Sequence, residues 1–387
     1  MNYEMPVKTK PYKHQQKARQ LSSLYGKGLQ IVILNYDSVW LLTDELSEYN
    51  ADLIIADEGH KIKNGQAKQS QAMHQLGDNA QYKLLLTGTL FTGKEIDVFS
   101  QYRFLDADIL GKWFPDFRGR YFYMGGYGGH TPIFRQCMKD DFLANVHSIA
   151  YRITKAECLD LPEITEETRL VNLDRKALRI YSDLENNWYS DLDNTDITAN
   201  IILTKLLRLL QITGRYVTDD NGTVNLVSEA KLDTLADIID TTMEEGGKLV
   251  IMARFIPELD GIQAMLREKK IVYAAVQGDT KNRDLEIRRF QNNDDCRVFV
   301  GQIATAGHGI TLTAASTMVF YSYDYSMTNF EQAKARIHRA GQKENCHYIY
   351  LACMDTIDCK VLQALRQKQD LAKMLIDDYC AGRNPFK

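Results

Sequence analysis

The stretch KLVIM, residues 248–252, places four apolar residues in an unbroken row after a single lysine. Alternating apolar and polar residues indicate a strand with one face in water, whereas an unbroken run indicates a strand buried on both faces, as in parallel sheets. Seven more runs share this pattern, at residues 30–34, 52–56, 83–87, 271–275, 297–300, 318–321 and 347–352. Helical stretches separate the later runs, at residues 258–269, 281–292 and 329–340. This alternation predicts an α/β fold of parallel sheets flanked by helices.

The runs are divided unequally along the chain. Five lie in the C-terminal part, enough for a complete lobe, but only three lie in the N-terminal part. Between them, apolar residues recur at helical spacing (201–212), and a turn-rich stretch, TDDNGTVN, follows at 218–225. We therefore expect an N-terminal lobe over residues 1–134, a helical insert over 135–225 and a C-terminal lobe over 226–387.

Composition limits the classes of protein that this chain can belong to. Its 387 residues favour two or three domains. The net charge of −4 gives no overall attraction to nucleic acid, so any DNA surface must be a local patch. Seven cysteines include no Cys-x-x-Cys pair, which favours reduced thiols over zinc or disulfides. Neither a signal peptide nor a membrane span is evident, and we expect a cytoplasmic protein.

Two adjacent carboxylates, Asp57 and Glu58, follow the apolar run at 52–56. Open α/β sheets bind ligands at the carboxyl ends of their strands. There, one carboxylate can hold magnesium through its water shell while a second orients the attacking water in phosphoryl transfer. Taken alone, the pair is more typical of a solvated strand end.

A second candidate lies on the helix expected at 329–340. Thr328 and Glu331 have capping-box spacing at its start, and Gly341 suits its end. Three polar residues share one face because they are spaced four and three apart, namely Gln332, Arg336 and Arg339. Two neighbouring guanidinium groups repel unless an anion lies between them, and a transferring phosphate is such an anion. A solvated basic helix face is the alternative.

Together these segments resemble one family. DEGHKIKN (57–64, a DEAH-like box), LLLTGT (84–89), TAGHGITLTAA (305–315) and QAKARIHRAGQ (332–342) resemble, in order, motifs II, III, V and VI of the Swi/Snf-type ATPases of helicase superfamily two. NYDSVW (35–40) resembles motif Ib, KLVIMARF (248–255) motif IV, and QGDTKNRDLEIRRF (277–290) the segment after it. SQYRFLD (100–106), YMGGYGGH (123–130) and YRITKAECLDLP (151–162) are similar to the compact phage and prophage branch.

The resemblance implies two RecA-like lobes, ATP with Mg²⁺ as cofactor, double-stranded DNA as partner and the cytoplasm of a bacterial or phage-infected host cell. It implies that Asp57 coordinates magnesium through water, that Glu58 polarises the attacking water, and that Arg336 and Arg339 act as arginine fingers with Gln332 beside them. Further nucleotide residues would be Gln15, His60, Thr87, Thr89 and Gly307. DNA would be held mainly through its backbone, with Asn35, Lys63, Gly278 and Thr305 near its track.

Two departures from the family pattern stand out. Leu90 occupies the position after Thr-Gly-Thr where the family usually has proline. The larger departure is that no G-x-x-x-x-G-K-[ST] phosphate loop lies between Gln15 and the segment at 35–40. In YGKGLQ (25–30), no hydroxyl residue follows the lysine and no strand precedes the glycines.

The absence of the phosphate loop has three possible explanations. The segment was deleted, naturally or by engineering; it is absent from the sequence as read; or the first lobe is a functional remnant. Two or three βαβ units are absent, roughly 60–100 residues. A lobe without them would expose sheet edges and apolar surface. We therefore expect an ATP-dependent DNA translocase or remodelling helicase by resemblance, with its first lobe incomplete and turnover lost. The alternatives are a catalytically dead DNA-binding module and a deletion fragment.

Overall fold

The computed structural model describes residues 30–378, except 89, 91–94, 126–130, 154–159, 193–198, 219–222, 307–308, 368–370, 372–373 and 376–377. The chain divides into two compact units, residues 1–152 and 153–387. The expected insert, 135–225, is thereby divided between the two units. Across the described residues, no helix combines the length and the apolar character needed to cross a membrane.

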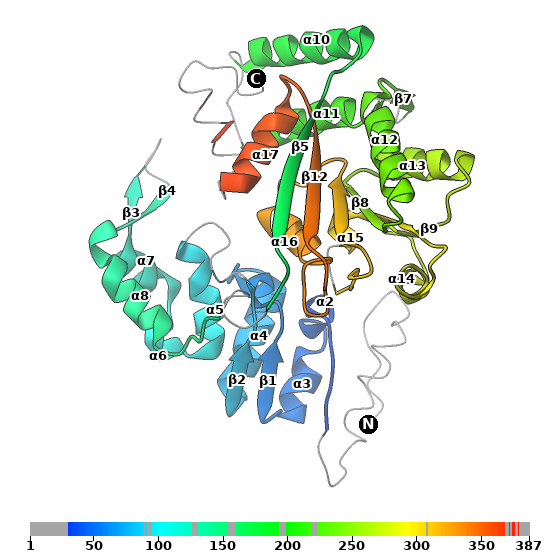
Figure 1. Cartoon of the computed structure of the whole chain (residues 1–387). Helices are drawn as coiled ribbons and strands as arrows, with labels where there is room; N and C mark the ends of the chain where they lie inside the picture. Colours follow the sequence, from blue (N-terminus) through cyan, green and yellow to red (C-terminus); the bar gives the residue numbers. More distant parts are fainter. Residues whose placement is uncertain are drawn as a thin grey trace. The chain divides into compact units, whose positions relative to one another are not determined.

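The second unit is built on a parallel sheet of six strands in the order β5-β12-β11-β8-β10-β9 (Figure 1). The strands are β5 (Ile164–Val171), β8 (Leu249–Ala253), β9 (Tyr273–Val276), β10 (Val298–Gln302), β11 (Thr317–Phe320) and β12 (Cys346–Cys353). All five C-terminal strands predicted from the unbroken apolar runs are confirmed. The sixth strand, β5, was not predicted, because its sequence ITEETRLV is largely polar and it lies at the edge of the sheet.

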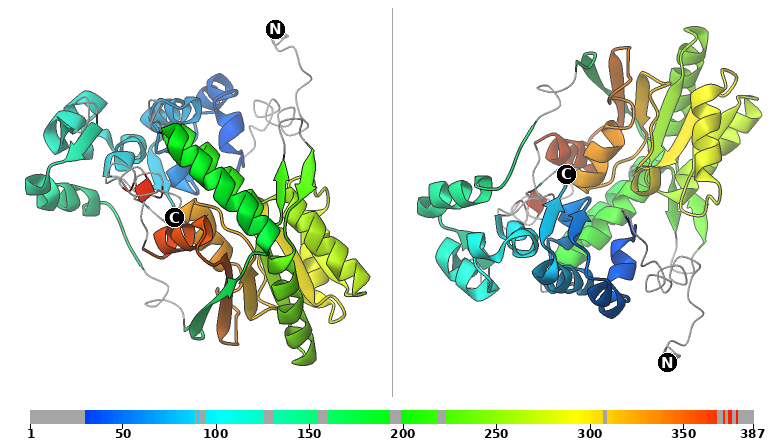
Figure 2. Two further views of the ribbon diagram at one scale, coloured as in Figure 1. Left: turned by 90° about the horizontal axis from the view of Figure 1, so that it is seen from above. Right: turned by 90° about the horizontal axis from the view of Figure 1, so that it is seen from below.

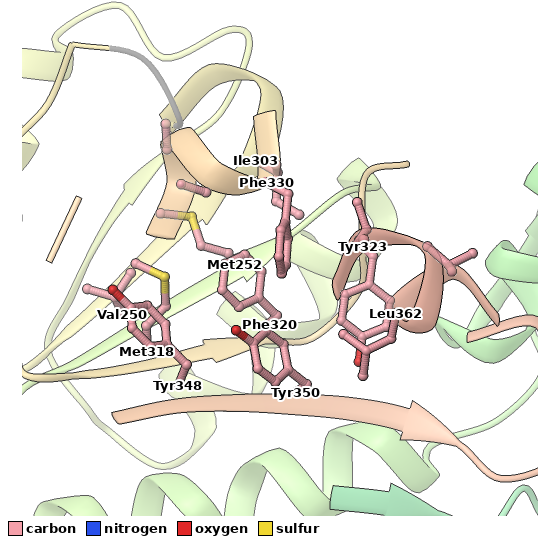
Figure 3. Close-up of a cluster of buried hydrophobic side chains, with 14 of the residues drawn as sticks. Val250, Met252, Ile303, Met318, Phe320, Tyr323, Phe330, Tyr348, Tyr350 and Leu362 are labelled. Atoms are coloured by element: carbon pink, nitrogen blue, oxygen red, sulfur yellow. The ribbon is translucent and has the colours of Figure 1, made fainter. Parts of the chain in front are cut away.

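Helices cover both faces of this sheet (Figure 2). They are α10 (Arg175–Leu192), α11 (Ala199–Thr213), α12 (Ala230–Glu244), α13 (Ile256–Glu268), α14 (Arg283–Asn292), α15 (Ile303–Ala306), α16 (Met327–Lys334) and α17 (Ile357–Gln367). Neighbouring residues of β8 face opposite ways. Leu249 and Ile251 pack with α12 and α13, whereas Val250 and Met252 join the larger cluster of Figure 3. Both faces are therefore buried, and the predicted α/β class is confirmed.

A short antiparallel hairpin occupies the stretch predicted as a domain boundary. Its strands are β6 (Tyr216–Thr218) and β7 (Val224–Leu226). The five described cysteines, Cys137, Cys296, Cys346, Cys353 and Cys359, are free thiols.

The first unit contains much less sheet. Strands β1 (Leu53–Ala56) and β2 (Tyr82–Leu85) pair in parallel, and β3 (Phe122–Gly125) and β4 (Thr131–Phe134) form a hairpin. Its helices include α2 (Tyr36–Val39), α3 (Thr43–Tyr49), α4 (Lys68–Asn79), α5 (Val98–Leu105), α6 (Ala107–Leu110), α7 (Phe114–Tyr121) and α8 (Lys139–His147), with 3-10 turns η2 (Gly59–Ile62), η3 (Glu95–Asp97) and η5 (Gln136–Met138). The strand predicted at 30–34 is wrong, since the residues there lie in no strand.

Within the described part of the chain, only one face of the β1–β2 pair is packed. Ile54, Ala56 and Leu85 lie in a core cluster with residues of α4. The opposite face carries five exposed apolar side chains, namely Leu53 at 50%, Ile55 at 54%, Tyr82 at 59%, and Leu84 and Leu86 at 45% each. Parallel sheets are ordinarily covered on both sides, so this bare face is unusual.

Candidate functional site

The carboxylate pair follows directly on the end of β1, as predicted. Glu58 adopts a left-handed backbone, with φ 50° and ψ 51°, a conformation that costs a non-glycine residue about 1 kcal/mol or more. Its N–H donates to Asp57 Oδ1 at 2.9 Å, and its Oε2 lies 3.2 Å from His60 Nδ1. The Asp57 side chain is exposed, and that of Glu58 is half-buried. The turn therefore presents two carboxylates at the carboxyl end of a parallel strand.

Two hydrogen bonds hold this turn in place. The Tyr36 hydroxyl donates to the Asp57 carbonyl at 2.7 Å, and burial together with the charges of Asp57 and Glu58 raises the pKa of Tyr36 to about 12. The Gly59 N–H donates to the Leu86 carbonyl at 2.8 Å. A Cβ on Gly59 would lie 2.3 Å from Leu85 side-chain atoms, so this close approach to β2 requires glycine.

The 3-10 turn η2 that follows is anchored from two helices. The Ser100 hydroxyl donates to the Ile62 carbonyl at 2.5 Å, and His74 Nε2 lies 3.1 Å from Ser100 Oγ. Burial lowers the pKa of His74, which favours its neutral form. Neither residue was singled out from the sequence, because only the fold brings α4 and α5 to η2.

Other predicted residues of the first unit have ordinary contacts or lie outside the described residues. Asn35 Oδ1 accepts the Ser38 N–H at 2.9 Å and so caps α2, while Lys63 Nζ lies 3.9 Å from Asp97 Oδ2. Thr87 is half-buried just beyond β2. Gln15, Thr89 and Gly307, the last in the second unit, lie outside the described residues.

The arginine helix differs from its prediction at both ends. Its N-cap is Ser326, whose hydroxyl accepts the Asn329 N–H at 3.3 Å, so the expected capping box of Thr328 and Glu331 is wrong. α16 ends at Lys334 rather than near residue 340. The Arg336 carbonyl accepts the Leu312 N–H at 2.9 Å, a bond that a continuing helix would make with residue 340. A tertiary contact thus replaces the last helical turn.

The two arginines nevertheless come together. Arg336 Nη1 and Arg339 Nη1 both donate to the Ile310 carbonyl, at 3.1 and 2.9 Å. Arg336 Nε also donates to the carbonyl of Gln332 at 2.7 Å. Both arginine side chains are half-buried. One carbonyl dipole offsets little of the repulsion between two cations, so this arrangement favours an anion beside them.

Gly278 and Thr305, which were predicted to lie near DNA, both form hydrogen bonds with one residue, Gln302. The sequence did not indicate a role for this residue. Gln302, the last residue of β10, accepts from the Gly278 N–H at 3.2 Å and from the Thr305 hydroxyl at 3.1 Å through its Oε1. Its Nε2 faces the Arg254 carbonyl at 3.4 Å. The only signal in the sequence is one amide two residues after the apolar run at 297–300.

The comparisons with known proteins all point to the same family. The SNF2-related domain matches residues 5–220, and the helicase conserved C-terminal domain matches residues 230–341. A Drosophila melanogaster SWI/SNF-related matrix-associated actin-dependent regulator of chromatin subfamily A-like protein 1 is 26% identical over 358 residues, covering 90% of this chain and 45% of the relative. A human DNA repair and recombination protein RAD54-like is 24% identical over 388 residues, covering 90% and 51%.

Among solved structures, the Sulfolobus solfataricus SWI2/SNF2 ATPase core in complex with dsDNA aligns with a TM-score of 0.45 at 25% identity, covering 90% of this chain and 73% of that one. The chain spans about half the length of both curated relatives. The SNF2-related match alone covers more than half of the 387 residues. This chain belongs to the SNF2-related family of helicase superfamily two.

Proposed function

We propose that this chain derives from an ATP-dependent double-stranded-DNA translocase of the phage-like Swi/Snf branch, acting in the cytoplasm, and that as it stands it does not turn over ATP. The main support for the proposal is the carboxylate turn at the end of β1, which is suited to magnesium and water. The sequence of the same unit has no phosphate loop, and its sheet has a bare apolar face.

The residues present fit a Mg²⁺–ATP complex only in part. Asp57 offers an exposed carboxylate, the ligand type that magnesium prefers. Within the described ranges, no group of three or more His, Cys, Asp or Glu side chains could hold a metal ion. Magnesium would therefore depend on phosphate oxygens and on a loop hydroxyl for the rest of its site. Without that loop, binding at Asp57 is weak.

The contacts of Glu58, Arg336 and Arg339 support a role in phosphoryl transfer for each of them. Glu58, held by His60, would orient the attacking water, and Mg²⁺ would neutralise phosphate charge when bound. Arg336 and Arg339 would exchange their shared Ile310 carbonyl for phosphate oxygens, because a full anion attracts them more strongly. What the sequence lacks is the G-x-x-x-x-G-K-[ST] loop, whose backbone N–H groups and lysine would hold the phosphates in line.

DNA binding is the part of the function that this chain retains. Gly278 and Thr305 lie at the carboxyl ends of β9 and β10, joined by Gln302. Contacts to the DNA backbone carry little sequence information and release counterions, so binding should depend strongly on salt and weakly on sequence. Binding titrations with two unrelated duplexes at about 50 and 200 mM salt test this. Equal affinity at both salt concentrations would contradict backbone binding.

The second candidate is a DNA-binding module that never had a catalytic role. The left-handed Glu58 argues against it, because strained backbone at a carboxylate pair is typical of a catalytic turn. Isothermal titration with Mg²⁺–ATP separates the two proposals. A descendant of an ATPase should bind nucleotide weakly and lose that binding in Asp57→Asn, whereas a module of the second kind should show no Asp57-dependent binding.

A further inference from the structure

A groove of about 620 Å³ lies along the outer edge of β9, the last strand of the second unit's sheet. Its walls come from β9, from the turn that follows it and from α14. β9 pairs with β10 on one side, and none of the described strands pairs with its other side. An unpaired strand edge of this kind can accept an added strand through main-chain hydrogen bonds.

Two N–H groups on this edge point away from β10. The Gln277 N–H donates to the Thr280 hydroxyl at 2.9 Å, and the Ala275 N–H lies 3.3 Å from Glu286 Oε2. The second contact is long for a hydrogen bond, so a carbonyl group of an added strand could take the place of Glu286. The same contact shows that a carboxylate is accommodated at this edge.

Apolar side chains are exposed in the same groove. Leu285 of α14 is 61% exposed, and Val272, just before β9, is 39% exposed. A single exposed apolar residue is ordinary, but two that line one groove offer an apolar contact to a ligand. An extended peptide presents every second side chain to one side, so its apolar residues can face this contact while their neighbours remain in solvent.

The charges of the groove indicate which peptide fits it best. Lys281 and Arg289 line the groove, and Arg267 Nη1 contacts the hydroxyl of Tyr273, which also lines it, at 3.1 Å. Glu286 is the single carboxylate among the described residues that line the groove, and its Oε2 lies 3.8 Å from Arg289 Nη1. Three cations beside one carboxylate favour an acidic ligand.

We propose that the free edge of β9 binds an extended, acidic segment of a partner protein, which adds to the sheet as a further strand. The main chain of the segment bonds to the outward groups of β9, and its apolar side chains contact Leu285. Its carboxylates pair with Lys281 and Arg289, which fix its position along the groove. This binding is separate from the proposed action on nucleotide and DNA.

Fluorescence anisotropy tests this with three capped, labelled peptides, DEVTIDE, DEVPIDE and KRVTIKR. The second peptide has a proline that removes a main-chain donor, and the third reverses the charge of the first. Binding is measured to the full chain as wild type and as Lys281→Glu, Leu285→Ala and Glu286→Ala. Lys343→Glu is the matched control, because it reverses the charge of an exposed lysine outside the groove. Circular dichroism checks the folding of each variant.

Wild type should bind DEVTIDE saturably and bind the other two peptides much more weakly. Lys281→Glu should weaken DEVTIDE binding roughly three- to tenfold, because an exposed ion pair becomes a contact of like charges, and Lys343→Glu should match wild type. Leu285→Ala should also weaken it. Glu286→Ala should tighten binding roughly two- to fivefold, since it frees the Ala275 N–H and removes a like charge. A gain in affinity cannot come from a variant that fails to fold.

Three results would overturn the inference. The first is that DEVTIDE does not bind, or that DEVPIDE or KRVTIKR binds equally well. The second is that Lys281→Glu weakens binding of duplex DNA but leaves DEVTIDE affinity unchanged, since the groove would then be a nucleic-acid surface. The third is a wild-type dimer, seen by size-exclusion chromatography, that Leu285→Ala dissociates, because a second copy of the chain would then fill the groove.

Discussion

Arg336 and Arg339 have unequal structural roles although both donate to the Ile310 carbonyl. Arg336 also donates through Nε to the Gln332 carbonyl, and its own carbonyl accepts the Leu312 N–H. Arg339 has one such bond to Ile310. The sequence suggested two exposed arginines on a helix face, for which substitution would cost within about 0.5 kcal/mol. The observed contacts change that expectation for Arg336.

Arg336→Ala should therefore lower the free energy of unfolding by about 1–2 kcal/mol, because half-buried carbonyls lose a charged donor. Arg339→Ala should cost less than about 1 kcal/mol, since Arg336 still donates to Ile310. Urea unfolding followed by circular dichroism measures both, with Arg339→Lys as the control that keeps charge. A larger loss for Arg339→Ala than for Arg336→Ala would contradict these assigned roles.

Glu258 is a buried carboxyl group that the proposed chemistry does not use. Its side chain is buried at the start of α13, where Oε2 accepts from the Phe255 N–H at 3.1 Å and from the Ser322 hydroxyl at 2.5 Å. The buried ion pair of Lys231 and Asp358, 2.6 Å apart, is close enough to act on it electrostatically. Burial raises the pKa of Glu258 to about 7, and Ser322 and Lys231 oppose this only in part.

Because its folded-state pKa is raised, Glu258 contributes stability that is complete below its unfolded pKa of 4.5 and is lost as pH rises to about 7. Glu258→Gln stays neutral and should lack this loss. Between pH 5 and 7, the free energy of unfolding of wild type should fall relative to the variant by on the order of 1–3 kcal/mol. Urea titrations at several pH values measure the difference, and parallel pH profiles would contradict it.

Among the elements, the β1–β2 pair permits a test with two adjacent residues. Ile55 is 54% exposed on the bare face, whereas Ile54 packs in the cluster with α4. Ile55→Lys should leave stability within about 0.5 kcal/mol and reduce both ANS fluorescence and light scattering. Ile54→Lys should cost several kcal/mol, because it buries a charge. If Ile55→Lys destabilises as much as Ile54→Lys, another part of the protein covers that face.

Sequence patterns predicted the elements whose structure depends on burial alone. The unbroken apolar runs predicted β1, β2 and β8 to β12, because strands of parallel sheets are rich in apolar residues. The pattern failed for β5, an edge strand that is partly solvated, and for residues 30–34, which form no strand. It also extended α16 past Lys334, where a bond between distant residues ends the helix.

Prediction of the candidate sites was limited in the same way, because contacts between residues distant in sequence could not be predicted. Asp57 and Glu58 could be predicted because strand and carboxylates are contiguous in sequence. The pairing of Arg336 with Arg339 was predicted from helical spacing, but the structure achieves it through Ile310. Gln302 could not be predicted, since its contacts with Gly278 and Thr305 depend on loops that only the folded sheet brings together.

At the scale of the whole molecule, the residues proposed to act on nucleotide fall in both units. The first has the carboxylate turn, and the second has the arginine pair. In phosphoryl transfer, positioning and electrostatic stabilisation supply nearly all of the catalysis. A missing phosphate loop therefore removes the largest contribution to catalysis rather than reducing a minor one.

DNA-stimulated release of phosphate from ATP tests this account most directly, in a preparation whose intact mass matches 44.3 kDa. Wild type and Glu58→Gln are compared at saturating Mg²⁺–ATP, with and without duplex DNA. The account predicts the same background rate for both proteins and no stimulation by DNA. Robust DNA-stimulated turnover in wild type that disappears in Glu58→Gln would contradict it, because another segment would then have to hold the phosphates.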